Sequence, residues 1–106
     1  MSGVSFPYRY PYEHVAASQS LQVLGDTGAV GNYLHRLVCT VSTAATSLVQ
    51  IKDGSLATHT VLPNAVGGGI GVYNIELNMV SRSGAWQVTT GAGVEVLAVG
   101  VFSTYT

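Results

Sequence analysis

Apolar and polar residues alternate through much of the carboxyl-terminal third of the chain. Ile75, Leu77 and Met79 are separated by polar residues, and Trp86 and Val88 are separated by a glutamine. A period of two is typical of β-strands with one buried face and one solvated face. Two such strands are therefore predicted, and the alternation with Val88 favours a core position for Trp86 over an exposed one.

The segment that follows is apolar on both of its faces. One row contains Val94, Val96, Ala98, Gly100 and Phe102, and the other contains Leu97, Val99 and Val101. A solvent-facing strand keeps one polar row, whereas a strand without one is buried on both sides. We therefore expect this strand to lie inside a sheet and to be covered on both faces, by its own domain or by another chain.

Shorter strands are predicted in the first half of the chain. In residues 18–24 the alternation points Leu21 and Val23 toward a core. The longest of these strands covers residues 33–41. Strict alternation would place four of its residues together on one face: His35, Leu37, Cys39 and Val41.

A hairpin is predicted around the dipeptide Asp53-Gly54. A strand at 47–52 precedes this dipeptide, and a strand at 57–62 follows it. Asp-Gly is a strong signal for a tight turn between antiparallel strands, because glycine adopts a positive φ without steric cost.

These segments amount to about seven or eight short strands with turn signals between them, and no window supports a long helix. This spacing predicts an all-β fold: a β-sandwich of about seven or eight short antiparallel strands, with a jelly roll as one form and a small barrel as the alternative. A chain of 106 residues is long enough for one domain. We assign the sandwich to residues 18–106 and an extended arm to residues 1–17.

The predicted arm is rich in aromatic residues. Pro7 and Pro11 fix their own φ angles and favour extended geometry in the residues before them. An extended arm cannot bury its rings on itself, so we expect it to dock on a neighbouring subunit or on its own sheet, with a frayed tail as the alternative. The candidate assembly contacts are Phe6, Tyr8, Arg9, Tyr10 and Tyr12.

The composition also favours association. Charged residues make up 8% of the chain, compared with about 25% in ordinary soluble domains, and the net charge is −1. Soluble monomers usually depend on surface charge. We therefore expect much of the surface to be covered in an oligomer or assembly. The alternative is that uncharged polar residues keep the surface hydrated.

The same composition argues against several classes of protein. The four cations are scattered, so no basic surface for nucleic acid is predicted. No apolar run is long enough for a transmembrane helix, and the amino terminus lacks the features of a signal peptide. Cys39 is the single cysteine, which is consistent with a protein made and assembled in a reducing compartment.

No catalytic, metal or cofactor site is predicted. His35 and His59 lie in predicted strands and could face each other, but no zinc-binding pattern surrounds them. Glu76 and Glu95 would be neighbours only if their strands paired, and a glycosidase needs such facing carboxylates.

A glycine-rich loop and the cysteine are the other candidates for chemistry. Residues 25–28 contain two glycines, yet no phosphate-binding pattern is present and no helix follows, so we interpret this segment as a turn. Cys39 is too far along its strand from His35 to pair with it as a nucleophile, and we expect a buried, apolar role.

The segment VLPNAVGGGIGVYNIELNMVSRSGAWQVTTGAGVEVLAVGVF resembles small, glycine-rich, charge-poor β-proteins of tailed-bacteriophage virions. The greatest resemblance is to capsid decoration, or cement, proteins with a sandwich or jelly-roll core, and it extends over about residues 18–102. This resemblance implies a homotrimer on the outer capsid surface, bound to the major capsid protein, with an arm that reaches a neighbouring subunit.

The resulting hypothesis is a non-enzymatic virion structural protein that stabilises a phage capsid by clamping adjacent shell subunits. Binding only to the assembled shell would shift the assembly equilibrium by mass action. The alternative is a receptor- or carbohydrate-binding module of a tail fibre or tail tip, with Tyr73 and Trp86 as stacking platforms. No nucleic acid, membrane or cofactor is expected in either case.

Overall fold

A computed structural model describes residues 12–25 and 31–102 of the chain. These residues form eight strands and one short 3₁₀-helix, η1 (Ala44–Thr46). The strands are β1 (Tyr12–Val15), β2 (Gln22–Val23), β3 (Tyr33–Val41), β4 (Val49–Asp53), β5 (Thr58–Leu62), β6 (Gly71–Val80), β7 (Trp86–Thr90) and β8 (Val94–Val101).

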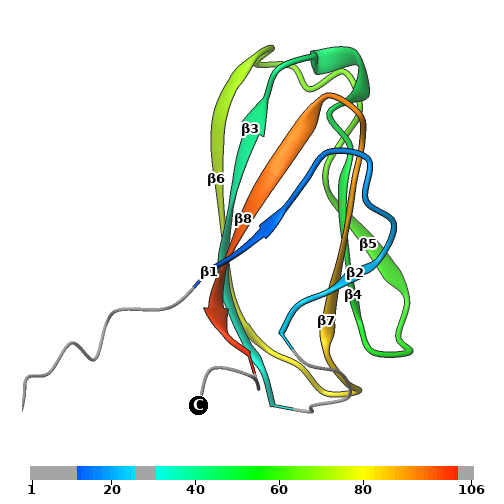
Figure 1. Cartoon of the computed structure of the whole chain (residues 1–106), viewed down its shortest axis with the longest axis vertical. Helices are drawn as coiled ribbons and strands as arrows, with labels where there is room; N and C mark the ends of the chain where they lie inside the picture. The colour runs from blue at the N-terminus through cyan, green and yellow to red at the C-terminus, as the bar shows by residue number, and fades with distance from the viewer. Residues whose placement is uncertain (1–11, 26–30, 103–106) are drawn as a thin grey trace, which may run out of the picture.

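The strands form two antiparallel sheets that pack as the layers of a sandwich (Figure 1). The first sheet has the order β1-β8-β3-β6, and the second has the order β2-β7-β4-β5. Strand β1 pairs with β8, β2 with β7, β3 with β6 and β4 with β5, as in a long hairpin wrapped into two layers. This is the strand order of a jelly roll. The predicted all-β sandwich is therefore confirmed.

The core lies between the two sheets and comes from the rows that the alternation predicted. In β7, Trp86 and Val88 are buried. In β8, Val94, Val96 and Ala98 face inward, and Phe102, directly after the strand, is buried as well. Trp86 is 5% exposed, and its indole Nε1 donates a hydrogen bond of 3.0 Å to the carbonyl oxygen of Asn32. The prediction that Trp86 is a core residue is confirmed.

A bulge in β3 changes which residues of this strand face the core. The register with both neighbouring strands shifts between Leu34 and Arg36. An extra residue at this point shifts the alternation, so Leu34 is fully buried while His35 is only partly buried. The prediction that His35 shares one face with Leu37, Cys39 and Val41 is therefore wrong at His35, whereas the other three are buried together.

The segment 18–24 also differs from its prediction. Only Gln22 and Val23 are in a strand, because Ser18 and Leu21 adopt positive φ angles of 61° and 50°. The left-handed backbone at Leu21 breaks the alternation. Leu24 is fully buried instead, and the side chain of Leu21 is exposed.

Part of the predicted arm belongs to the sandwich. Residues 12–15 form β1, which pairs with β8, and residues 1–11 lie outside the described residues. Glu13 joins the two sheets at this edge, because its carboxylate accepts hydrogen bonds from Gln22 Nε2 (2.9 Å) and from the amide of Gly25 (2.7 Å).

Candidate functional site

The outer face of the β1-β8-β3-β6 sheet carries apolar side chains where an antiparallel sheet usually presents polar ones. Strand β8 lies between β1 and β3, as predicted for a strand without a polar row. Its inner row is buried against the second sheet. On its outer row, Leu97 is 37% exposed and Val101 is 47% exposed. No element of the described residues covers this row.

Neighbouring strands extend the apolar surface on both sides of β8. Opposite residues of paired antiparallel strands point to the same face. On this rule Tyr12 lies beside Val99, Val38 beside Leu97, and Tyr33 beside Val101. We call this surface the outer apolar face, made of Tyr12, Tyr33, Val38, Leu97, Val99 and Val101.

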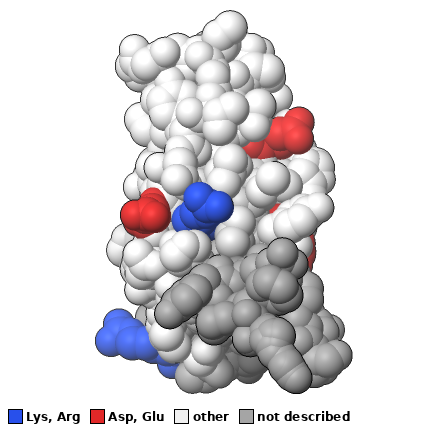
Figure 2. All heavy atoms as spheres, turned by 90° about the vertical axis from the view of Figure 1, so that its left-hand side faces the viewer, with Lys and Arg blue, Asp and Glu red and all other residues white. Residues whose placement is uncertain are grey.

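Charged residues lie on the same sheet surface (Figure 2). Arg36 pairs with Val99, His14 pairs with Leu97, and Glu95 is on the outer row of β8 itself. Arg36 of β3 lies opposite Glu76 of β6, and its Nε atom is buried without a hydrogen-bond partner. At one margin His14 Nε2 lies 3.1 Å from Glu95 Oε1. Both of these side chains are exposed, so this contact contributes little to stability.

A polar cluster borders the same face at the β3 bulge. The hydroxyl of Tyr33 donates a hydrogen bond of 2.7 Å to Asn78 Oδ1 and lies 3.0 Å from His35 Nδ1. Because the single hydroxyl hydrogen is directed at Asn78, His35 Nδ1 must donate in the second contact. Asn78 adopts a positive φ of 51°, in the part of β6 that pairs with the bulge.

Among the residues predicted as assembly contacts, only Tyr12 is described. It is 62% exposed and belongs to the outer apolar face. Phe6, Tyr8, Arg9 and Tyr10 lie outside the described residues.

The fold does not bring the candidate catalytic pairs together. His35 is in β3 and His59 is in β5, which belong to different sheets. Glu76 and Glu95 lie on β6 and β8, and β3 separates these strands. Within residues 12–25 and 31–102, no group of three His, Cys, Asp or Glu side chains is arranged to hold a metal ion.

Two further candidates have structural roles. Cys39 is fully buried, and desolvation raises the pKa of its thiol to about 11. The amide of Gly25, in the loop considered for phosphate binding, already donates to the carboxylate of Glu13 at 2.7 Å. An anion at Gly25 would have to displace this carboxylate; residues 26–28 of the predicted turn lie outside the described residues.

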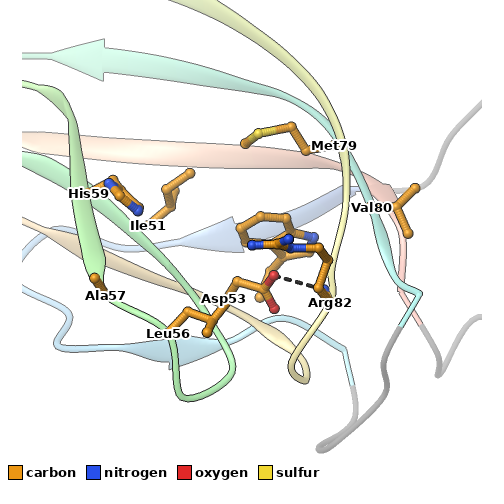
Figure 3. A pocket seen from close by; sticks show the side chains of 9 residues that line it. Ile51, Asp53, Leu56, Ala57, His59, Met79, Val80 and Arg82 are labelled. Carbon is orange, nitrogen blue, oxygen red and sulfur yellow. Dashed lines mark hydrogen bonds between the residues drawn. The ribbon is translucent and has the colours of Figure 1, made fainter.

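A pocket opens on the opposite side of the sandwich from β1 and β2, between the edge strands β5 and β6 (Figure 3). Its volume is about 380 Å³. Most of the lining is apolar, and three side chains can carry charge. The lining residues are Ile51, Asp53, Leu56, Ala57, His59, Met79, Val80, Arg82 and Trp86.

Asp53 organises one wall of this pocket. Its carboxylate accepts hydrogen bonds from three successive backbone amides, those of Arg82 (2.8 Å), Ser83 (3.1 Å) and Gly84 (3.3 Å). The turn between β6 and β7 is thereby fixed to the end of β4. Gly54 follows with a φ of 53°, and a Cβ atom there would lie 2.6 Å from the backbone of Gly84.

Sequence reasoning identified Asp53-Gly54 as a turn but missed both the capping role of Asp53 and the pocket. The amides that Asp53 binds lie 29 to 31 residues away, so no local spacing could reveal the contact. The pocket depends on which strands lie at the edges of the two sheets.

Comparison with known proteins finds no matching family model, no similar curated protein and no similar solved structure. Among the described residues, no helix has the length and apolar character needed to cross a membrane.

Proposed function

We propose that this chain is a non-enzymatic assembly protein that attaches to its partner through the outer apolar face. The observation that carries this proposal is the exposed outer row of β8. Leu97 and Val101 lie exposed on the sheet's outer surface beside Val38, Val99 and Tyr33, with Arg36, His14 and Glu95 as the polar residues of the same surface. Exposed apolar patches of this kind are typical of protein-protein contact sites.

Burying this face against a partner would contribute a modest free energy of binding per copy of the chain, and several copies would be needed for firm attachment. Fully burying a leucine or valine side chain contributes about 1.5–3 kcal/mol. Leu97 and Val101 each retain between a third and a half of their exposure, so each could contribute roughly 0.5–1.5 kcal/mol. Several copies that bind a shared lattice would multiply such contacts by avidity.

The partner that we propose is the major capsid protein of a tailed bacteriophage, bound from the outside of the shell by a homotrimer of this chain. The support for this partner is the resemblance of residues 18–102 to capsid decoration proteins, together with the low charge of the chain. Jelly rolls also occur in lectins and other proteins, so the fold alone does not identify the partner.

The carbohydrate-binding alternative has less support. Trp86, one of its two stacking platforms, is buried in the core. Tyr73, the other, is half-buried, and its hydroxyl donates a hydrogen bond of 2.6 Å to the carbonyl oxygen of Gly69.

Co-sedimentation with capsid shells that lack this chain tests the proposal. We expect the double variant Leu97→Thr/Val101→Thr to fold normally, because threonine suits strands, and to bind shells at least about tenfold more weakly. Ile70→Ser is the matched control, since Ile70 is 70% exposed but lies outside the outer apolar face. Equal shell binding by the double variant and the parent chain would refute the role of this face.

Deletion of residues 1–11 tests the predicted arm separately. The cut is placed before Tyr12 because this residue begins β1 and pairs with Val99. We expect normal thermal unfolding and weaker attachment to the shell. Unchanged occupancy on the shell would remove the arm from the mechanism.

A further inference from the structure

We infer that the pocket between β5 and β6 is a binding site for a compact organic acid with an aromatic or branched apolar body. This site lies on the opposite side of the sandwich from β1, and the inference does not depend on the proposed attachment through the outer apolar face. It rests on the shape of the pocket, its apolar floor and the position of its charged groups.

The floor suits an apolar ligand body. Ile51 and Trp86 belong to the core and close the bottom of the pocket, and Met79 is the last inward-facing residue of β6. Leu56 and Ala57, from the turn after β4, form the opposite wall (Figure 3). A volume of about 380 Å³ lies within the usual range for small-molecule sites.

The guanidinium of Arg82 favours an anionic ligand, and the opposing charge of Asp53 is engaged by the backbone. Asp53 is 8% exposed, and three backbone amides already surround its carboxylate. The contact between Asp53 and Arg82 involves the backbone amide of Arg82, and no ion pair of its guanidinium is found within the described residues. The guanidinium is therefore available at the pocket to bind a carboxylate through two parallel hydrogen bonds.

His59 adds a second polar group on the opposite wall. It is exposed on the edge strand β5 and lines the pocket together with Arg82. A few polar groups around an apolar cavity are the usual arrangement of a small-molecule site, in which the apolar part gives affinity and the polar groups fix orientation.

Two fluorescent probes of the same shape separate these contributions. 1-Anilinonaphthalene-8-sulfonate carries an anionic group, and N-phenyl-1-naphthylamine is its uncharged counterpart. Trp86 is the only tryptophan of the chain, so energy transfer from its indole reports a probe bound to the chain, and the variants below assign that probe to the pocket or to another surface. Both probes are titrated into the full-length chain, and the stoichiometry is determined from the saturation point.

We expect one anionic probe per chain, with efficient energy transfer from Trp86. Arg82→Gln should weaken binding of the sulfonate about five- to tenfold and change binding of the neutral probe less than about twofold. Ala57→Phe, which fills the mouth of the pocket, should weaken both probes about tenfold or more. Ile70→Ser is the control for an exposed apolar residue elsewhere, and urea unfolding verifies that each variant is folded.

Three results would overturn the inference. If Ala57→Phe binds both probes as well as the parent chain does, the pocket is not the site. If Leu97→Thr/Val101→Thr removes the signal, the probes bind the outer apolar face. If Arg82→Gln affects both probes equally, the site does not select an anion.

Discussion

The substitution Asp53→Ala removes the contact that fixes the turn between β6 and β7 to the end of β4. In the parent chain the carboxylate accepts three backbone hydrogen bonds, with lengths of 2.8, 3.1 and 3.3 Å. A hydrogen bond to a charged group contributes about 1.5–3 kcal/mol, and bonds that share one carboxylate are not additive. We therefore expect the free energy of unfolding to fall by about 2–4 kcal/mol. Typical domains have a total of only about 5–15 kcal/mol.

Urea unfolding, monitored through the fluorescence of Trp86, measures this loss of unfolding free energy, because Trp86 is buried and lies directly after the turn. Asp53→Asn keeps one acceptor oxygen but turns an NH₂ group toward a backbone amide, so it should lose roughly half as much stability as Asp53→Ala. Ser83→Ala is the local control. It removes only hydrogen bonds between exposed groups, those with Ser55, and should cost less than about 1 kcal/mol.

The reasoning is refuted if Asp53→Ala lowers the free energy of unfolding by less than about 0.5 kcal/mol, the usual range for an unremarkable surface substitution. Equal stability of Asp53→Asn and the parent chain would also contradict it, since the two side chains are nearly the same size and differ in the hydrogen bonds that they can accept.

Three further predictions follow from buried contacts. Gly100→Ala should destabilise the chain by about 2–3 kcal/mol in urea unfolding, because a Cβ atom there would lie 2.1 Å from the carbonyl oxygen of Tyr33; an unchanged midpoint would contradict this. Cys39, whose thiol pKa is raised to about 11, should react with iodoacetamide at pH 8 only after unfolding, and rapid labelling of the folded chain would contradict its burial. The free energy of unfolding should fall as the pH rises from about 9 toward 11, because the thiol ionises at a lower pH in the unfolded chain than in the folded one. Glu13→Ala should cost about 1–3 kcal/mol through loss of two hydrogen bonds to its carboxylate, and urea unfolding that matches the parent chain would show that this link between the sheets is dispensable.

The fold was predictable where strands are regular. Alternation identified the buried rows of the strands around Ile75, Val88 and Val96, because the side-chain period of a strand is a local property. It failed at His35 and Leu21. A bulge in one case and a left-handed residue in the other shift the alternation, and both depend on partner strands that are distant in sequence.

The candidate surfaces were predictable only in part. The outer apolar row of β8 was recognisable from the chain, because its residues are contiguous and lack a polar face. The pocket was not, because residues of β4, β5, β6 and β7 meet there only once the jelly roll has formed. Strand order is decided by long-range pairing, which local composition does not encode.

The solution mass of the full-length chain, measured by sedimentation equilibrium, tests the central claim most directly. The account predicts a species of three chains of 11.0 kDa each. Leu97→Thr/Val101→Thr should sediment like the parent chain, because the outer apolar face is proposed to bind the shell and not a second copy of this chain. A parent chain that sediments as an 11.0 kDa monomer at every concentration reached would contradict the proposed homotrimer.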